Sequence, residues 1–366
     1  MRILNKFSEL KYFDLFSGIG GFRLGADRYF KEKKVPGRCV GYCEMNKYAV
    51  KTYQCNFHTQ DEIFVPNVED LTLLNSEKNI KMEQAADEKR LNQIRNLLPS
   101  FDILFAGFPC QPFSIFGNKQ GFNDLRGNLF FHILAILNAI RPSFLMLENV
   151  KGLRSIGNGS VLKTIIEMLQ KNYNVYHWIL NSADYGIPQI RRRIFIVGVD
   201  KKFNYFNDLT VPPRKIALKQ STYPTAWHLL ERKTLKKYYL SEKIKKTILS
   251  NGTGRFFYIS KINQLIARPL CKTMHKMHRA SQDNYYSDDF INGTFDEKSW
   301  KVNLSKSGSD QIRRITPLEA FRLQGFPDSF LKKSKMSGLS DSQLYMQAGN
   351  AVSVQVVRAV LEHLLG

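Results

Sequence analysis

The chain has few of the features that mark a membrane or secreted protein. None of its apolar runs approaches the roughly 20 residues that a membrane-spanning helix needs. Residues 1–6 lack the apolar stretch of a signal peptide, so we expect a cytoplasmic protein with no membrane association. Only five cysteines occur among 366 residues, an odd and small number that favours free thiols in a reducing compartment over a disulfide framework.

Acidic residues are also scarce relative to basic ones. The 32 Asp and Glu residues are outnumbered by 54 Lys and Arg residues, and the net charge is +22. An excess of this size favours a polyanionic partner, nucleic acid first. A membrane surface is the weaker alternative, because no basic amphipathic helix stands out.

The cysteines offer one alternative use, a zinc site. The spacings of Cys39, Cys43, Cys55 and His58 are loosely finger-like. Cys39 and Cys43, however, flank residues 40–42 in what reads as a strand, and no second tight cysteine pair follows. We therefore expect no metal site.

The N-terminal part of the chain alternates short apolar runs with helix-prone segments. Expected strands occupy residues 11–16, 39–43, 103–106, 144–147, 173–180 and 193–199, and expected helices 22–30, 46–55, 128–140 and 161–171. This rhythm predicts an α/β fold with a doubly wound, mostly parallel sheet. Residues 71–99 interrupt it, and the charged stretch 83–98 predicts a surface insertion in the form of a solvated helix.

The character of the sequence changes near residue 206. Prolines cluster at 212–213, residues 232–246 are rich in lysine, and residues 250–305 are polar with short apolar runs. This composition predicts a second, smaller domain of short strands and long loops. Helices are expected again at 316–324 and 354–365. The predicted organisation is a first domain at 1–205, a second with its hinge at 206–330, and a C-terminal segment at 331–366 that returns to the first.

The most informative motif is GFPCQPFS, residues 107–114. Cys110 lies between two prolines, so it sits on a stiff, non-helical segment. The preceding run 101–107 reads as a short buried strand that ends in glycine, which presents the thiol at the carboxyl end of a strand. Taken alone, the motif fits a nucleophile and a buried structural thiol equally well.

A glycine loop and two acidic residues suggest a nucleotide-type site. Gly18, Gly20 and Gly21 stand at a strand–helix junction, where the helix N-terminus can receive a carboxylate or phosphate. Glu44 ends the next expected strand, where an acidic side chain can hold ribose hydroxyls. Asp70 ends a third expected strand and is placed to hold an adenine amino group.

Another carboxylate follows the apolar run 144–147. We expect this residue, Glu148, to face the same crevice as Cys110, because both stand at the carboxyl ends of strands. The alternative for this segment is a helix cap, a role that Asn149 would serve as well.

Arginines are concentrated in the run QIRRR, residues 189–193. In an extended chain alternate side chains share a face, so Gln189, Arg191 and Arg193 point one way and Arg192 the other. They suit either a solvated edge or the recognition of an anion or a carbonyl group.

Taken together, these segments resemble the cytosine-C5 DNA methyltransferase family. Residues 14–22 (DLFSGIGGF) resemble its cofactor loop, 107–114 its nucleophile loop, 148–150 (ENV) its catalytic acid and 189–193 its Gln-x-Arg-x-Arg segment. Residues 314–327 (RITPLEAFRLQGFP) and 347–352 (QAGNAV) resemble its two C-terminal motifs. Order and approximate spacing match over nearly the whole chain, and only the regions 206–312 and 71–99 lie outside.

The resemblance implies a DNA (cytosine-5) methyltransferase that flips a cytosine out of duplex DNA and uses S-adenosylmethionine. The implied catalytic residues are Cys110, which attacks C6; Glu148, which protonates N3; Arg193, which contacts O2; and Arg191, which contacts the phosphate or the loop beside the cysteine. The implied cofactor-binding residues are Phe16, Gly18, Gly20, Gly21, Glu44, Met45, Asp70, Pro109, Asn350 and Val352. The candidate DNA-binding residues are Gln111, Ser114, Arg126, Gln189, Lys272, His275 and Arg279.

The chain departs from the family pattern at two positions. Met45 stands where the family often has a larger apolar or aromatic group, and Ala351 stands where serine is common. The first change affects stacking against the adenine, and neither removes a group that the chemistry needs.

Three alternatives remain open from the sequence. A tRNA cytosine-5 methyltransferase of the same family would use the same chemistry, although the long region 206–312 favours duplex DNA. A nicotinamide or flavin oxidoreductase accounts for the glycine loop alone, and a non-catalytic DNA-binding relative leaves the filled catalytic positions unexplained. We expect a monomer that shares its DNA site with a restriction endonuclease.

Overall fold

The computed structural model describes residues 4–74, 82–108, 129–205, 207–250, 252–253, 256–257, 259–306 and 308–366. The chain forms two compact units. The first comprises Met1–Leu180, Arg192–Arg214 and Val356–Gly366, and the second comprises Asn181–Arg191 and Lys215–Gln355. The return to the first unit therefore begins at 356 rather than at 331, and the run 181–191 belongs to the second unit.

The first unit is built on a seven-stranded sheet with the order β3-β2-β1-β4-β5-β7-β6. Its strands are β1 (Leu10–Leu15), β2 (Gly37–Cys43), β3 (Ile63–Val65), β4 (Ile103–Gly107), β5 (Phe144–Val150), β6 (Tyr173–Asn181) and β7 (Arg192–Asp200). The strands from β3 to β5 pair in parallel, whereas β7 pairs antiparallel to β5. The predicted doubly wound, mostly parallel α/β sheet is confirmed.

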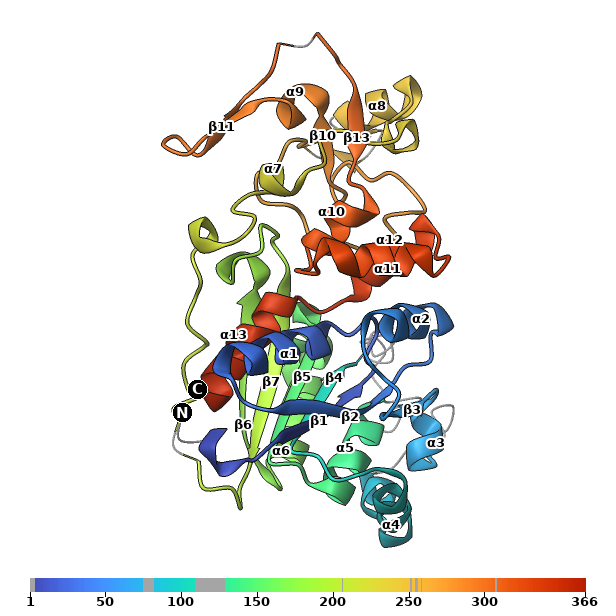
Figure 1. Cartoon of the computed structure of the whole chain (residues 1–366), viewed down its shortest axis with the longest axis vertical. Helices are drawn as coiled ribbons and strands as arrows, with labels where there is room; N and C mark the ends of the chain where they lie inside the picture. Colours follow the sequence, from blue (N-terminus) through green and yellow to red (C-terminus); the bar gives the residue numbers. More distant parts are fainter. Residues whose placement is uncertain are drawn as a thin grey trace. The chain divides into compact units, whose positions relative to one another are not determined.

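Helices cover both faces of this sheet. They are α1 (Gly21–Lys33), α2 (Lys47–Asn56), α3 (Val68–Thr72), α4 (Glu88–Leu97), α5 (Leu129–Ile140), α6 (Ser160–Leu169) and α13 (Val354–Leu365). Short 3-10 helices lie at Leu4–Lys6, Met82–Ala86, Lys151–Arg154 and Ile156–Gly159. Figure 1 shows α1 and α13 on one face and α5 and α6 on the other.

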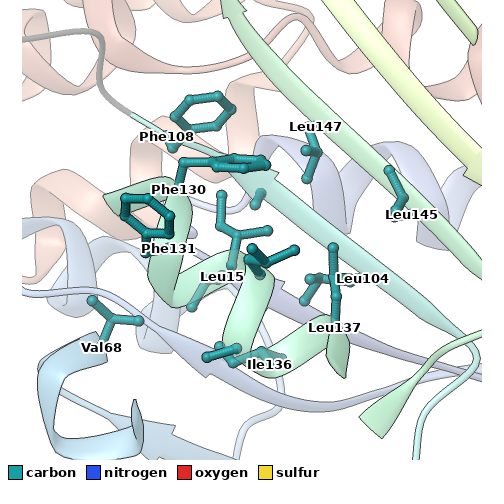
Figure 2. Close-up of a cluster of buried hydrophobic side chains, with 14 of the residues drawn as sticks. Leu15, Val68, Leu104, Phe108, Phe130, Phe131, Ile136, Leu137, Leu145 and Leu147 are labelled. Carbon is teal, nitrogen blue, oxygen red and sulfur yellow. The ribbon is translucent and has the colours of Figure 1, made fainter. Parts of the chain in front are cut away.

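Side-chain alternation along β1 explains the two layers. Phe13 and Leu15 point into the core that contains α5, whereas the ring of Tyr12 packs on Phe30 of α1. The central strands are apolar on both faces because both are covered, as parallel sheets require. Figure 2 shows the α5 side of this core, where Leu104 and Leu147 lie near Leu137 and Phe130.

The predicted surface insertion is wrong for α4. Leu91 and Ile94 of this helix are buried in the same core cluster as α5. Arg95 donates from Nε to the carbonyl of Ala139 at 3.0 Å, and Asn138 of α5 donates to the carbonyl of Ala85 at 3.1 Å. The charged residues of α4 occupy its outer face, so composition alone concealed a narrow apolar face.

The second unit consists of short elements joined by long loops, as predicted. Its strands are β8 (Gly252–Thr253), β9 (Phe256–Phe257), β10 (Tyr285–Ser287), β11 (Thr294–Asp296), β12 (Lys301–Asn303) and β13 (Ile312–Arg314). Its helices are α7 (Ala226–Leu229), α8 (Glu242–Leu249), α9 (Asp288–Ile291), α10 (Pro317–Arg322), α11 (Asp328–Met336) and α12 (Asp341–Asn350), with 3-10 turns at Ser182–Asp184, Leu218–Gln220 and Lys236–Tyr238.

Among the described residues of this unit, the strands pair in twos, β10 with β13, β11 with β12 and β8 with β9. In both units, no helix within the described ranges combines the length and the apolar character that crossing a membrane would require.

Candidate active site

The loop between β1 and α1 adopts an uncommon backbone conformation. Phe16, Gly18 and Gly20 have positive φ angles of 57°, 55° and 84°. An added Cβ at Gly20 would lie 2.3 Å from the ring of Phe57, so only glycine fits there. The amide of Ser17 donates to the carbonyl of Cys43 at 3.0 Å, which fixes the loop to the end of β2.

Glu44 joins this loop to the neighbouring strand ends. One carboxylate oxygen accepts from the amide of Gly18 at 2.9 Å and the other from the amide of Asn46 at 2.7 Å. Burial raises the pKa of the Glu44 carboxyl, while the amides of Asn46 and Gly18 oppose that shift. Each oxygen has a second lone pair, so the carboxylate retains acceptor capacity for a hydroxyl group.

Of two other predicted cofactor residues, Asp70 lies differently from expectation. Asp70 does not end a strand, because β3 ends at Val65 and Asp70 is exposed within the short helix α3. The prediction of a strand that ends at Asp70 was wrong because β3 has only three residues, of which the first two are exposed. Met45 follows Glu44 and is 79% exposed, so its side chain is open to a ligand.

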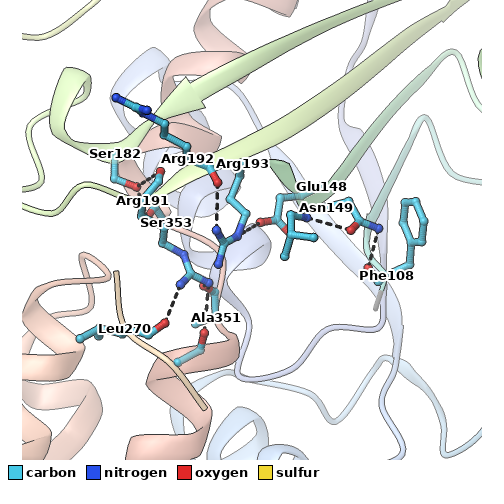
Figure 3. Close-up of polar contacts among 12 residues, drawn as sticks. Phe108, Glu148, Asn149, Ser182, Arg191, Arg192, Arg193, Leu270, Ala351 and Ser353 are labelled. Carbon is cyan, nitrogen blue, oxygen red and sulfur yellow. Dashed lines mark hydrogen bonds and ion pairs between the residues drawn. The ribbon is translucent and has the colours of Figure 1, made fainter. Parts of the chain in front are cut away.

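Glu148 and Arg193 form an ion pair at the ends of two neighbouring strands. The Nε of Arg193 lies 3.1 Å from Oε1 of Glu148, and the two side chains are 19% and 12% exposed. Both come from antiparallel strands, with Val150 of β5 opposite Arg193 of β7. Figure 3 shows the pair, with Asn149 beside it on β5. The structure thus brings together two of the predicted catalytic residues.

The end of β4 lies against the same strand. Gly107 is opposite Glu148 in the parallel register, and an added Cβ on it would lie 3.8 Å from the Glu148 carboxylate. Asn149 is buried and donates from Nδ2 to the carbonyl of Phe108 at 3.0 Å. Asn149 is therefore a tether for the segment that leads to Cys110, not a helix cap. In the sequence, the one indication of this role is that Asn149 directly follows Glu148.

Several predicted residues lie in the range 109–128, outside the described residues. They are Pro109, Cys110, Gln111, Ser114 and Arg126.

Gln189 and Arg191 are buried within the second unit. Gln189 donates from Nε2 to the carbonyl of Leu323 at 2.6 Å and accepts from the amide of Leu270 at 3.0 Å. The guanidinium of Arg191 donates to the carbonyls of Leu270, Gly349 and Ala351 at 3.2, 3.1 and 2.9 Å (Figure 3). The predicted alternation is confirmed by burial, since Ile190 and Arg192 between and beside them are exposed.

The burial bears on the DNA contact expected for Gln189. The whole side chain of Gln189 is inaccessible, so it does not offer a DNA contact. The guanidinium of Arg191 binds backbone carbonyls of its own unit. The loop beside the cysteine, which the resemblance implied as a partner of Arg191, lies outside the described residues.

The other predicted residues of the second unit lie at or near its surface. Lys272 is exposed, and His275 and Arg279 are half-buried. Arg279 pairs with Asp283 at 3.4 Å. Asn350 is the exposed last residue of α12, and Val352 is buried just after it.

Comparison with known proteins supports one family over nearly the whole chain. The family model described as C-5 cytosine-specific DNA methylase matches residues 10–366. The type II methyltransferase M.NlaX of Neisseria lactamica is 36% identical over 360 residues, which cover 97% of this chain and 96% of that protein. M.HpaII of Haemophilus parainfluenzae is 34% identical and covers 98% of this chain, and 89% of its own length is matched.

Solved structures agree on the fold. The Dnmt2 methyltransferase of S. pombe superposes with a TM-score of 0.66 at 18% identity, covering 98% of each chain. The methyltransferase EhMeth of Entamoeba histolytica gives a TM-score of 0.64 at 21% identity over 97% of this chain and 98% of its own. The oxidoreductase alternative finds no support in these relatives. The chain belongs to the C-5 cytosine-specific DNA methylase family, and it is a DNA cytosine-5 methyltransferase that takes its methyl group from S-adenosylmethionine.

Proposed function

We propose that the chain methylates cytosine in a specific duplex DNA site, with Cys110 as nucleophile and Glu148 and Arg193 acting on the flipped base. The observation that carries this assignment is the Glu148–Arg193 pair at the adjoining ends of β5 and β7. The end of β4 lies against the same carboxylate, and the chain runs from there to Cys110 two residues after Phe108.

The chemistry explains why these groups are needed. Cytosine C5 is a poor nucleophile until a thiolate adds to C6, because the addition converts the ring into an enamine. The Cys110 sulfur forms a bond to C6 while N3 takes a proton from Glu148. S-adenosylmethionine, when bound, would supply the methyl group to C5 and leave as S-adenosylhomocysteine. A water molecule then removes the C5 proton, N3 returns its proton to Glu148, and the C6–S bond breaks to release the thiolate.

Arg193 has a part in both states of the site. In the protein without DNA its guanidinium holds the Glu148 carboxylate in place. With the base bound, the same planar group turns to cytosine O2, where it stabilises the negative charge that builds up during thiolate addition. Glu148 is then left to bind N3 and the exocyclic amine.

The loop after β1 fits S-adenosylmethionine, which supplies an electrophilic methyl group when bound. An added Cβ at Gly18 would meet no atom within 4 Å, so the loop backbone borders open space. The hydroxyl of Ser17 is buried and has no hydrogen-bond partner among the described residues. Glu44 would receive ribose hydroxyls, and the N-terminus of α1 at Gly21 would receive the carboxylate of the ligand. We assign the rest of the cofactor contacts to Phe16, Gly20, Met45, Asp70, Pro109, Asn350 and Val352.

We further propose that the second unit reads the DNA site through Lys272, His275 and Arg279, with Gln111, Ser114 and Arg126 contacting DNA beside the base. The basic excess of the chain suits a phosphate backbone. The relatives are named as type II methyltransferases, which supports an endonuclease that shares the site. We place the protein in the cytoplasm as a monomer.

The test is a duplex in which the target base is 5-fluorocytosine. Fluorine at C5 cannot leave as a cation, so elimination stops and a denaturation-stable adduct accumulates. We expect the adduct with the wild-type chain and with Cys55→Ser, a matched control in α2, and none with Cys110→Ser. An adduct that persists in Cys110→Ser would show that another residue is the nucleophile.

A further inference from the structure

The run 187–191 is the organising segment of the second unit. It pairs with Ala267, whose amide donates to the carbonyl of Pro188 at 2.7 Å and whose carbonyl accepts from the amide of Ile190 at 2.8 Å. From this anchored segment, Gln189 and Arg191 reach backbone groups at positions 270, 323, 349 and 351. These two buried side chains, here called the 189/191 clamp, hold three stretches that are far apart in sequence.

Two of those stretches touch each other directly. An added Cβ at Gly349 would lie 2.4 Å from the amide nitrogen of Lys272 and 2.5 Å from the carbonyl carbon of Cys271. Real Cβ atoms do not approach this closely, so the end of α12 packs backbone to backbone on the segment that begins at Leu270. Arg191 binds the carbonyls on both sides of this contact.

Two residues next to this contact are proposed to bind different ligands. Lys272 is exposed and begins the segment proposed to read DNA, and Asn350 is exposed and is proposed to contact the cofactor. The guanidinium fork and the close packing at Gly349 leave little room for Lys272 and Asn350 to shift independently.

We infer that Gln189 and Arg191 are positioning residues that couple cofactor binding to DNA binding, and that neither touches the nucleic acid. The coupling presupposes the ligand roles of Asn350 and Lys272 proposed above. By thermodynamic linkage, a ligand that fixes the position of Asn350 raises the affinity for DNA by a certain factor, and DNA raises the affinity for that ligand by the same factor.

The coupling is measured with S-adenosylhomocysteine, which fills the cofactor site without methyl transfer. The DNA is a duplex carrying the site that methylcytosine sequencing identifies in expressing cells. The coupling factor is the Kd for duplex without S-adenosylhomocysteine divided by the Kd with it. We expect a factor of about 5 to 150 for the wild-type chain, and a fall towards one in Arg191→Lys, because an ammonium cannot reproduce the planar fork.

Arg192→Lys is the matched control, since the exposed neighbour undergoes the same substitution and should keep the wild-type factor. A salt titration separates positioning from a phosphate contact. Because lysine would keep a phosphate contact, this titration uses Arg191→Met, in which the slope of log K against log[salt] should be unchanged, whereas loss of a phosphate contact would change it by about 0.9. If Arg191→Lys does not fold by circular dichroism, Gln189→Met, which removes the bonds to Leu323 and Leu270, takes its place.

Three results would overturn the inference: a wild-type factor of one, a wild-type factor retained in the clamp variant, or a slope that falls by about 0.9 in Arg191→Met. Methyl transfer by the wild-type chain to the same duplex is followed in parallel. Its absence would count against the proposed function, whereas its presence with an unaltered coupling factor would count against the clamp alone.

Discussion

The two units of the chain satisfy their buried backbone in different ways. In the first unit the seven-stranded sheet and the helices on it pair their own main-chain groups, and apolar side chains fill the space between sheet and helices. In the second unit the strands are two or three residues long and pair only in twos. Loops there leave carbonyls and amides that buried polar side chains must satisfy.

Several buried polar side chains of the second unit form such hydrogen bonds. Gln324 donates to the carbonyl of Ala348 at 2.7 Å, in addition to the bonds of the 189/191 clamp. Arg313 and Glu319, both 0% exposed, form a bidentate pair at 2.7 and 2.9 Å. The lesson is that a rigid sheet can carry the chemistry while an irregular unit still holds a definite shape, provided that its polar groups are paired.

The comparison of the two units first predicts that the second unit sets the DNA sequence specificity and that the first unit carries the methyl-transfer chemistry. Residues 215–312, taken from a relative with a different known site, should transfer that site completely when grafted into this chain, because we propose that the groove contacts lie in the second unit. Methylcytosine sequencing of DNA from expressing cells reads the result. The reciprocal graft serves as the control, and an active chimera that keeps its original site would refute the separation.

Within the first unit, Glu148→Gln should lower turnover by about 10²–10⁴-fold, because the amide cannot supply the proton that N3 needs. Binding of S-adenosylmethionine should be retained. Single-turnover methylation of duplex DNA is the measurement, with Glu167→Gln, an exposed acid on α6, as the control. A loss below about fivefold would exclude the assigned role.

In the second unit, Glu319→Gln should cost about 3–5 kcal/mol in free energy of unfolding, because it leaves the buried guanidinium of Arg313 uncompensated. Urea unfolding followed by the fluorescence of Trp227 and Trp300 reports on this unit in a Trp178→Phe background. Glu297→Gln changes an exposed acid on the same unit and should stay within about 0.5 kcal/mol. Equal effects of the two variants would mean that the buried pair is dispensable.

The first unit should respond to loss of apolar volume instead. Ile94→Ala in α4 should cost about 2–5 kcal/mol, because Ile94 is fully buried against the α5 core. Asn96→Ala alters an exposed position of the same helix and provides the reference. Urea unfolding of the Trp227→Phe, Trp300→Phe background, with Trp178 as probe, measures both. If the two variants unfold alike, α4 is the solvated excursion that its composition suggested.

Within the first unit, the accuracy of prediction depends on how much apolar signal each element carries. β1, β2, β4 and β5 lie within a few residues of their expected bounds, because each is a compact apolar run between turn residues. α4 was misjudged because seven charged or amide side chains surround Leu91 and Ile94, which are spaced one helical turn apart. Asp70 was misplaced because the edge strand β3 is short and half exposed, so its sequence carries little apolar signal.

The sequence by itself determined the family, the parallel sheet and the positions of Glu148 and Arg193 at strand ends, because these depend on local apolar runs and on motifs of fixed residue type. Tertiary structure alone decided what the polar residues do. Arg191 and Arg193 differ by two positions, yet one binds the carbonyls of Leu270, Gly349 and Ala351 and the other pairs with Glu148. A guanidinium has the same donors wherever it stands, so its role is set by acceptors that arrive from distant parts of the chain.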